Sequence, residues 1–293
     1  MNILLLGCTG QVGWELQRTL APLGELLSLD FPEIDLTQAD SVRKLIEDRR
    51  PQLIVNATAY TAVDRAESEP ELALAVNAQA PGILAQAAQT VQAALIHYST
   101  DYVFDGRKGS AYVETDPARP LGVYGSSKLA GEKAIREVGG AYLILRTSWV
   151  YSLRRPSFVT KVLEWSRKQP VLRMVTDQVA NPTSARMLAE VTSQLLAQSI
   201  PDSYAWLRER SGIYHLAGSG TASRMEWAQE ILRYDPRPQE QVVDKIEPAL
   251  TADFPAPAQR PLYSALNCDL FRETFGLSLP DWRIALQLNL AAE

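Results

Sequence analysis

The chain opens with a short apolar run that is followed at once by three evenly spaced glycines. Residues 3–6 read Ile-Leu-Leu-Leu, and the next seven residues, Gly-Cys-Thr-Gly-Gln-Val-Gly, place Gly7, Gly10 and Gly13 three positions apart. An amphipathic stretch of helical length follows at residues 12–22. A buried strand, a glycine turn and a helix in this order allow a dinucleotide's phosphates to approach the backbone at the helix N-terminus. This pattern predicts an α/β fold that starts with a dinucleotide-binding unit.

The same alternation continues as far as about residue 150. We expect strands at residues 3–6, 26–29, 53–56, 94–99 and 142–147, and helices at residues 12–22, 41–50, 71–89 and 124–138. Several of the strand runs are apolar at successive positions, as in parallel strands that are covered on both faces. We therefore predict a Rossmann-type, doubly wound parallel sheet. Right-handed crossovers would place the loops after the strands along one edge of that sheet, where ligands bind.

The regular alternation of strands and helices ends after about residue 150. Helical stretches are expected at residues 157–168, 184–198 and 224–232, and six prolines lie between residues 236 and 261. Prolines at this density favour irregular structure, here closing over a ligand. We predict a dinucleotide-binding domain over residues 1–150. Residues 151–293 are then mainly a smaller C-terminal substrate lobe, with some segments returning to the first domain.

Composition excludes several classes of protein. The 293 residues carry a net charge of −5, so a basic face for nucleic acid is not expected. No apolar stretch approaches the roughly 20 residues that span a bilayer. Two cysteines and two histidines leave little scope for a disulfide framework or a zinc site. We expect a cytoplasmic protein that binds neither nucleic acid nor membranes.

The glycine loop and the ends of the next strands supply candidate cofactor ligands. The loop contributes Gly7, Thr9, Gly10, Gln11, Val12 and Gly13. Asp30 ends the second apolar run, where an acidic residue binds the adenosine ribose, although a turn aspartate before Pro32 is an equally good interpretation. Asp35 and Leu36 follow and are candidates for the adenine pocket.

Three further residues point to proton transfer. Tyr124 and Lys128 lie one helical turn apart, so both project from one helix face, and an ammonium there would stabilise a phenolate. The pKa of free tyrosine is ~10, so catalysis near neutral pH would need it lowered by about three units. Y-x-x-x-K also occurs by chance, but Thr100 at a strand end could hold a carbonyl oxygen while Tyr124 donates the proton. Together these residues predict a reductase.

Several motifs resemble those of the dTDP-4-dehydrorhamnose reductases of the extended short-chain dehydrogenase superfamily. They are the glycine loop, N-A-T-A-Y-T-A-V-D at 56–64, S-T-D-Y-V-F-D-G at 99–106, the Tyr124/Lys128 pair, R-T-S-W-V-Y at 146–151 and N-P-T at 181–183. The resemblance runs through nearly the whole chain. Its most specific parts are Asp64-x-x-Glu67, S-T-D-Y-V-F and R-T-S-W-V-Y.

The resemblance implies an activity and a set of residues. Thr100, Tyr124 and Lys128 become the catalytic set, and 56–64 adds Ala57, Ala59 and Tyr60 to the cofactor site and Thr61 to the substrate site. The family reduces the 4-keto group of dTDP-4-dehydro-L-rhamnose, a small-molecule nucleotide sugar, to give dTDP-L-rhamnose. It uses NADPH and often NADH.

Other residues have two interpretations. Tyr102 and Trp149 follow strand ends and can line a sugar pocket, with core packing equally good for each. Arg260 can pair with a substrate pyrophosphate or form a surface ion pair. His97 falls in a strand, which favours a hydrogen-bonded core histidine over a catalytic base. Tyr102 also stands where dehydratases of the superfamily carry a glutamate, which disfavours dehydration.

The chain departs from the family pattern at two places. Some relatives dimerise around a magnesium ion held partly by a carboxylate, and Arg186 stands at that position, so Glu15 at another ligand position becomes an ordinary first-turn helix residue. We therefore expect no metal, and a monomer or weak homodimer. Ala111 replaces a common proline in the loop after Gly106, which leaves the closure of that loop open. Another nucleotide-sugar reductase or epimerase, or a non-catalytic regulatory subunit of the same fold, remains an alternative.

Overall fold

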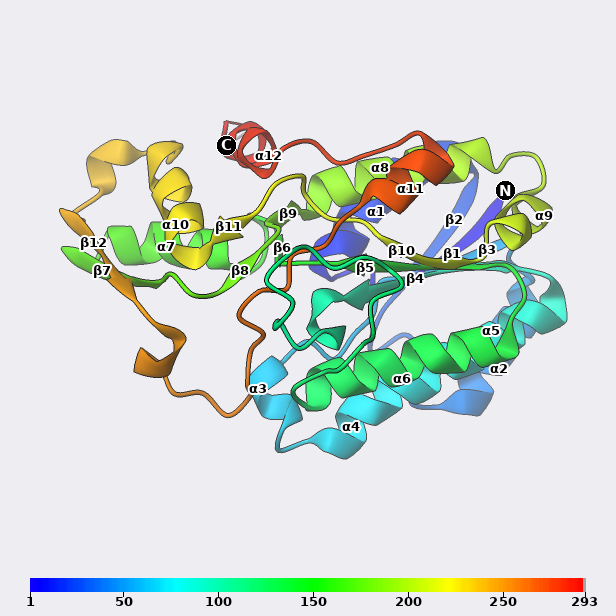
Figure 1. Ribbon diagram of the computed structural model, residues 1–293. Helices are drawn as coiled ribbons and strands as arrows, with labels where there is room; N and C mark the ends of the chain where they lie inside the picture. Colours follow the sequence, from blue (N-terminus) through cyan, green and yellow to red (C-terminus); the bar gives the residue numbers. More distant parts are fainter. Residues whose placement is uncertain (292–293) are drawn as a thin grey trace.

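The computed structural model describes residues 1–291 and is built on a six-stranded parallel sheet (Figure 1). The strand order is β10-β5-β4-β3-β1-β2, and every neighbouring pair is parallel. The strands are β1 (Asn2–Leu6), β2 (Glu25–Leu29), β3 (Leu53–Asn56), β4 (Ala94–Thr100), β5 (Tyr142–Thr147) and β10 (Gly212–His215). The predicted doubly wound sheet and its first five strands are confirmed, whereas β10 was not predicted.

Helices cover both faces of the sheet (Figure 1). One layer contains α1 (Gln11–Leu20), α8 (Ala185–Gln198), α9 (Ser203–Glu209) and α11 (Asp269–Phe275), and the other contains α2 (Ala39–Arg49), α5 (Ala80–Val91) and α6 (Val123–Val138). In β1, Ile3 and Leu5 pack toward the first layer, while Leu4 and Leu6 pack toward the second. Alternate residues of one continuous apolar run thus pack against helices on opposite faces of the sheet, because successive strand side chains point to opposite faces.

The helix predicted at residues 71–89 is divided in the structure. It consists of α4 (Pro70–Leu74), the π-helical turn η2 (Ala75–Gln79) and α5. Pro81 lacks the N–H that would bond to the carbonyl of Asn77, which interrupts the regular hydrogen-bond ladder. The side chain of Asn77 bonds to both backbone groups of Tyr60, at 2.9 and 3.1 Å, and to Ser127 Oγ at 3.0 Å. The turn therefore ties the loop after β3 to α6.

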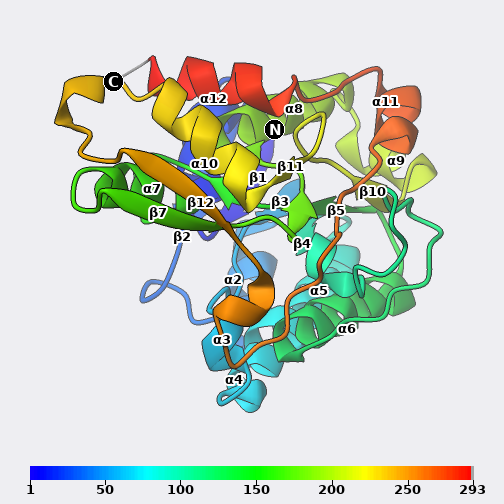
Figure 2. The same cartoon turned by 60° about the vertical axis from the view of Figure 1, so that its left-hand side comes forward.

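A second core lies beside the sheet (Figure 2). Its helices are α7 (Phe158–Ser166), α10 (Arg224–Arg233) and α12 (Trp282–Leu290), and its paired strands are β7 (Val171–Val175) with β12 (Lys245–Ala249), β6 (Val150–Tyr151) with β9 (Thr183–Ser184), and β8 (Val179–Ala180) with β11 (Ala222–Ser223). Strand β12 corrects the expectation of irregular structure in the proline-rich segment. It accommodates Pro248 because a two-stranded ribbon leaves one edge of each strand without partners.

Short elements complete the chain. They are α3 (Val63–Ala66), η1 (Ala21–Leu23), η3 (Asp101–Val103), η4 (Pro238–Glu240) and η5 (Thr251–Asp253). Two later segments return to the sheet: β10 pairs with β5, and α8 packs along α1. Within residues 1–291, no helix combines the length and the apolar character needed to cross a membrane.

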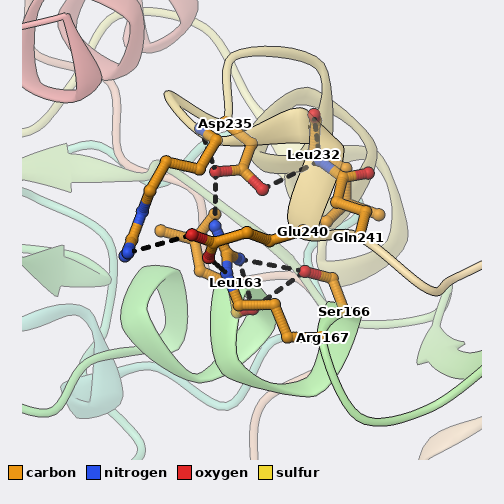
Figure 3. Close-up of polar contacts among 8 residues, drawn as sticks. Leu163, Ser166, Arg167, Leu232, Asp235, Glu240 and Gln241 are labelled. Atoms are coloured by element: carbon orange, nitrogen blue, oxygen red, sulfur yellow. Dashed lines mark hydrogen bonds and ion pairs between the residues drawn. The ribbon is translucent and has the colours of Figure 1, made fainter.

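Loops of the second core are fixed by one arginine (Figure 3). Arg167, at the end of α7, donates from Nη2 to Asp235 Oδ1 at 2.7 Å and from Nε to Glu240 Oε2 at 2.9 Å. Gln241 Nε2 donates to the other oxygen of Asp235 at 2.9 Å. The segment after α10 is thus anchored to α7 by charge-assisted hydrogen bonds rather than by apolar packing alone.

Candidate active site

A cavity of about 940 Å³ opens where the parallel strands end, and both cores contribute to its walls. This volume lies within the range of small-molecule sites, roughly 300–1,000 Å³. The predicted site residues that line it are Gly7, Thr9, Gly10, Gln11, Val12, Asp30, Asp35, Leu36, Ala57, Ala59, Tyr60, Thr61, Thr100, Tyr102, Tyr124, Lys128 and Trp149. Gly13 and Arg260 do not line it. The fold therefore gathers residues from distant motifs around one space.

The glycine loop forms one end of the cavity. Gly7 has a φ of +85°, and a side chain at Gly13 would place its Cβ 1.9 Å from the carbonyl oxygen of Gly7. Gly13 thus lets α1 pack closely on the turn, which is why it lies behind the wall instead of lining it. Helix α1 begins at Gln11, whose buried Oε1 has no hydrogen-bond partner among residues 1–291. A helix N-terminus and close backbone suit the phosphates of a cofactor, and the unused oxygen of Gln11 can accept a hydrogen bond from another part of the same cofactor.

Asp30 lies beside this loop at the end of β2. Its Oδ2 accepts hydrogen bonds from the backbone N–H and the hydroxyl of Thr9 at 2.8 and 2.6 Å. Its Oδ1 accepts from the N–H of Phe31 at 2.9 Å. Asp30 therefore orders the glycine loop and also borders the cavity, so its two interpretations are compatible with one another.

Thr100 and Tyr124 meet where β4 ends and α6 begins. Thr100 Oγ1 donates to Asp101 Oδ1 at 3.2 Å and accepts from the N–H of Tyr102 at 3.2 Å. The ring of Tyr124 packs edge-on against Tyr102, with centroids 5.6 Å apart. Burial raises the pKa of the buried Asp101 carboxyl to about 6. These contacts hold two hydroxyl groups at one side of the cavity.

The protein's own contacts do not supply the lowering of the Tyr124 pKa that catalysis near neutral pH would need. Burial raises the pKa of this phenol above its usual value, and a hydrogen bond with the Thr100 hydroxyl offsets only part of that effect. The physical reason is the orientation of Lys128, whose Nζ donates to the carbonyl of Tyr98 at 2.6 Å and lies 3.2 Å from His97 Nε2. A phenol that retains its proton is suited to donate it.

Lys128 is almost completely buried, with 1% of its surface exposed. Burial lowers the pKa of its amine to about 8, and the charge of Glu132 acts in the opposite direction. Glu132 in turn binds the guanidinium of Arg146 through two hydrogen bonds of 2.9 and 2.6 Å and accepts from Ser99 Oγ at 2.6 Å. This buried pair joins α6, β4 and β5 directly beneath the site. Sequence analysis did not single out Glu132, and it used Arg146 only as part of a motif.

The opposite wall carries an arginine that sequence analysis missed. Arg224 lines the cavity, and its guanidinium lies 3.5 Å from the ring centroid of Trp149. Burial lowers the pKa of Arg224 to about 10, and no hydrogen bond or ion pair to an acidic group is found among residues 1–291. Trp149 adopts a φ of +40°, a conformation that non-glycine residues seldom take away from functional sites. One signal was available: Arg224 is the first residue of α10, where the helix dipole disfavours a cation.

Of the two roles predicted for Arg260, the structure shows the ion pair. Its Nη2 binds Asp64 Oδ2 at 2.8 Å, and its Nη1 donates to the carbonyl of Ala258 at 3.1 Å. The Arg260 guanidinium lowers the pKa of the Asp64 carboxyl. Arg260 therefore fastens the proline-rich segment to α3, beside the cavity instead of within its wall.

The structure shows what surrounds Arg186 and Ala111, where the chain departs from the family pattern. Arg186 Nε lies 3.4 Å from Glu190 on α8, and Arg18 lies 3.7 Å from Glu15 and 3.1 Å from Glu190 across the contact of α1 with α8. The loop that contains Ala111 is held by Tyr112, whose hydroxyl donates to Asp105 at 2.8 Å and whose N–H donates to the carbonyl of Ala265 at 2.8 Å. This loop is therefore anchored without the proline.

Comparison with known proteins agrees with this geometry. The family model described as the RmlD substrate binding domain matches residues 1–293. A dTDP-4-dehydrorhamnose reductase of Burkholderia thailandensis is 43% identical over 291 residues, which cover 98% of this chain and 97% of that protein. The chain belongs to the dTDP-4-dehydrorhamnose reductase family. A second member, from Escherichia coli K12, is 42% identical over 297 residues, which cover 99% of this chain and 97% of that one.

Solved structures of the family superpose on nearly the whole chain. A dTDP-4-dehydrorhamnose reductase from Clostridium acetobutylicum has a TM-score of 0.91 at 33% identity and covers 100% of this chain and 99% of its own. The enzyme from Bacillus anthracis, solved in complex with NADP, has a TM-score of 0.90 at 32% identity, with 99% of each chain covered. A UDP-glucose 4-epimerase from Thermus thermophilus, 20% identical with a TM-score of 0.78, shares the fold. The predicted family and reductase class are confirmed.

Proposed function

We propose that this chain reduces the 4-keto group of dTDP-4-dehydro-L-rhamnose to dTDP-L-rhamnose with NADPH. The observation that carries the proposal is the convergence of Thr100, Tyr124 and Lys128 on a cavity whose other end is the glycine loop. The loop, the α1 N-terminus and the region of Asp30 would hold the dinucleotide. The relative from Bacillus anthracis was solved with NADP. When bound, the cofactor supplies the hydride.

The proton comes from the protein's own side chains in this proposal. Tyr124 keeps its phenolic proton because burial raises its pKa, so the phenol is the group that can donate to the oxygen of the keto carbon. Thr100 shares the hydrogen bond with Tyr124 and holds the same oxygen from the other side. Lys128 lies one turn away and returns a proton to the phenolate after each turnover.

The nucleotide sugar would occupy the wall formed by the second core. Its pyrophosphate requires cations, and Arg224 and Arg155 are the two arginines that line the cavity. Arg155 is exposed, whereas the guanidinium of Arg224 is stacked on Trp149. Tyr102 and Trp149 would contact the apolar face of the deoxyhexose, with Thr61 across the cavity. We assign substrate binding to these residues and give Arg224 the place that the sequence had suggested for Arg260.

Replacement of Tyr124 by phenylalanine tests the proposal. The variant keeps the ring and its contact with Tyr102 but loses the proton donor, so kcat should fall by about 10²–10⁴-fold while NADPH affinity remains near that of the wild type. The measurement is nicotinamide absorbance with the nucleotide 4-keto sugar as substrate. Tyr102→Phe is the matched control, since it removes a neighbouring hydroxyl and should retain most of kcat. Near-normal turnover by Tyr124→Phe would contradict the mechanism, whereas a wild-type protein without reductase activity would favour a regulatory subunit.

A further inference from the structure

A chain of hydrogen bonds with a defined direction runs from the loop after β3 to Lys128. It starts at the backbone N–H of Thr58, which lies 3.0 Å from Asn56 Oδ1. A backbone N–H can only donate, so the oxygen of the Asn56 side chain must face it. The hydroxyl of Thr58 contacts the same oxygen at 2.5 Å. The amide nitrogen of Asn56 is therefore directed to the other side, where His97 Nδ1 lies 3.1 Å away.

This contact determines the tautomer of His97. The imidazole is buried, with 1% of its surface exposed, and this burial lowers its pKa well below the usual value. A neutral imidazole has one N–H and one lone pair. Because Asn56 donates to Nδ1, the lone pair is at Nδ1 and the hydrogen is at Nε2. The Nε2–H group points at Lys128 Nζ, 3.2 Å away.

Lys128 can satisfy this contact in only one protonation state. An ammonium has three donors and no acceptor, so it would place N–H against N–H. A neutral amine can accept from His97 through its lone pair and still donate to the carbonyl of Tyr98, which lies 2.6 Å from Nζ. The two contacts of Nζ thus match an amine.

We infer that His97 is a positioning residue that presents an N–H to Lys128 and so favours the neutral amine over the ammonium. Uptake of a proton from solvent converts the amine to an ammonium, which cannot accept from His97. Protonation therefore breaks this contact and releases Nζ to donate toward the cavity that Lys128 lines. The inference rests on the role proposed above for Lys128. It adds that the direction in which this side chain points depends on its charge.

The other groups around Lys128 are compatible with this arrangement. Glu132, on the same helix, favours the ammonium, but both of its oxygens are bonded to Arg146 of β5. The phenols of Tyr98 and Tyr124 have pKa values raised by burial and remain uncharged. Asp101, after β4, is the remaining acid that borders this part of the cavity, and it is bonded to Thr100 and Ser264.

Nitrogen NMR of histidine-labelled protein reads the tautomer directly. The chain has two histidines, and His215 is a built-in control. His215 Nδ1 lies 3.1 Å from the carbonyl of Tyr112 and 3.2 Å from that of Asn267, so its hydrogen must be on Nδ1. At pH 7 without cofactor, we expect opposite tautomers, with the hydrogen on Nε2 of His97 and on Nδ1 of His215. A His97 with the hydrogen on Nδ1, or a charged His97, would overturn the inference whether or not the enzyme is active.

Asn56→Asp reverses the chain of hydrogen bonds. The carboxylate accepts from both Thr58 N–H and His97 Nδ1, which moves the imidazole hydrogen to Nδ1 and offers the Nε2 lone pair to an ammonium. The titration midpoint of Lys128 Nζ, followed in lysine-labelled protein and assigned by its loss in Lys128→Met, should rise by about one pH unit or more, a tenfold gain in proton affinity. The same substitution in a His97→Leu background is the control. A similar rise there would show that the new charge acts directly and would refute a role for His97.

Discussion

Two arginines, Arg146 buried beneath the candidate site and Arg224 half-buried in its wall, have different surroundings. Both guanidinium groups lie near aromatic rings, at 5.1 Å from the centroid of Phe104 and 3.5 Å from that of Trp149, respectively. Arg146 is also bonded to both oxygens of Glu132. Arg224 has no acidic partner among residues 1–291 and borders the cavity.

The difference separates a cation that belongs to the scaffold from one placed for a ligand. Removing a guanidinium from water costs several kcal/mol, which a carboxylate in good geometry can offset. An aromatic face offsets about 2 kcal/mol or somewhat more when desolvated. Arg224 therefore retains part of this unfavourable desolvation, which lowers the pKa of its guanidinium to about 10. An anionic ligand would relieve it on binding.

The largest expected effect is on the scaffold pair. Glu132→Gln leaves the Arg146 charge buried without its counter-ion, so the free energy of unfolding should fall by about 3–5 kcal/mol in chemical denaturation. Replacing both residues, with Glu132→Leu and Arg146→Met, removes the charge as well and should recover much of this loss. If the single and double variants were equally unstable, packing and not charge pairing would be the main role of Glu132.

Arg224→Met should weaken substrate binding without lowering stability, the reverse of what is expected for Glu132→Gln. It removes a cation that lacks a counter-ion, so stability should be unchanged or should increase, while KM for the nucleotide sugar should rise about 10–100-fold, as for loss of one charged contact worth ~1.4–2.7 kcal/mol. Steady-state kinetics and denaturation measure the two quantities. Arg233→Met, at the exposed end of the same helix, is the matched control and should alter neither. A loss of stability with unchanged KM would mean that Arg224 is a scaffold residue.

Arg167 provides an intermediate case (Figure 3). It is paired with Asp235 and Glu240 like a scaffold arginine, but it is partly exposed to solvent. Arg167→Met should lower the free energy of unfolding by ~1–3 kcal/mol, which is less than for Glu132→Gln. The reason is that water can partly solvate the carboxylates that lose their partner. Kinetic constants should remain near wild type. Chemical denaturation would contradict this order if it showed a greater loss for Arg167→Met than for Glu132→Gln.

The smallest effect is expected at Arg186, whose ion pair with Glu190 is exposed. Arg186→Ala should change the free energy of unfolding by less than about 0.5 kcal/mol. Because a cation stands at this position, we also predict that a chelator alters neither activity nor mass in solution. Light scattering and the reductase assay test this, and a chelator-dependent change in either would show that a metal ion is held elsewhere.

Local pattern was sufficient for much of the molecule. The five strands read from runs such as 3–6 are confirmed, because a parallel strand covered on both faces buries side chains at successive positions. The spacing of Tyr124 and Lys128 correctly placed both on one helix, and the glycines correctly marked the turn before α1. Helix 71–89 was only partly correct, because Pro81 interrupts its hydrogen-bond ladder and contacts of the Asn77 side chain with other segments hold the π-helical turn.

Residue types and local spacings by themselves determined five of the six strands and the glycine turn, and the resemblance of motifs identified the family and many of the side chains around the cavity. Tertiary structure alone decided which charges are paired: Arg146 with Glu132, Arg260 with Asp64, and Arg224 with no acid. It also decided that Lys128 turns toward His97 rather than toward the phenol of Tyr124. The physical reason is that protonation and pairing depend on burial and on donors brought together from distant segments, and no periodicity along the chain records those neighbours.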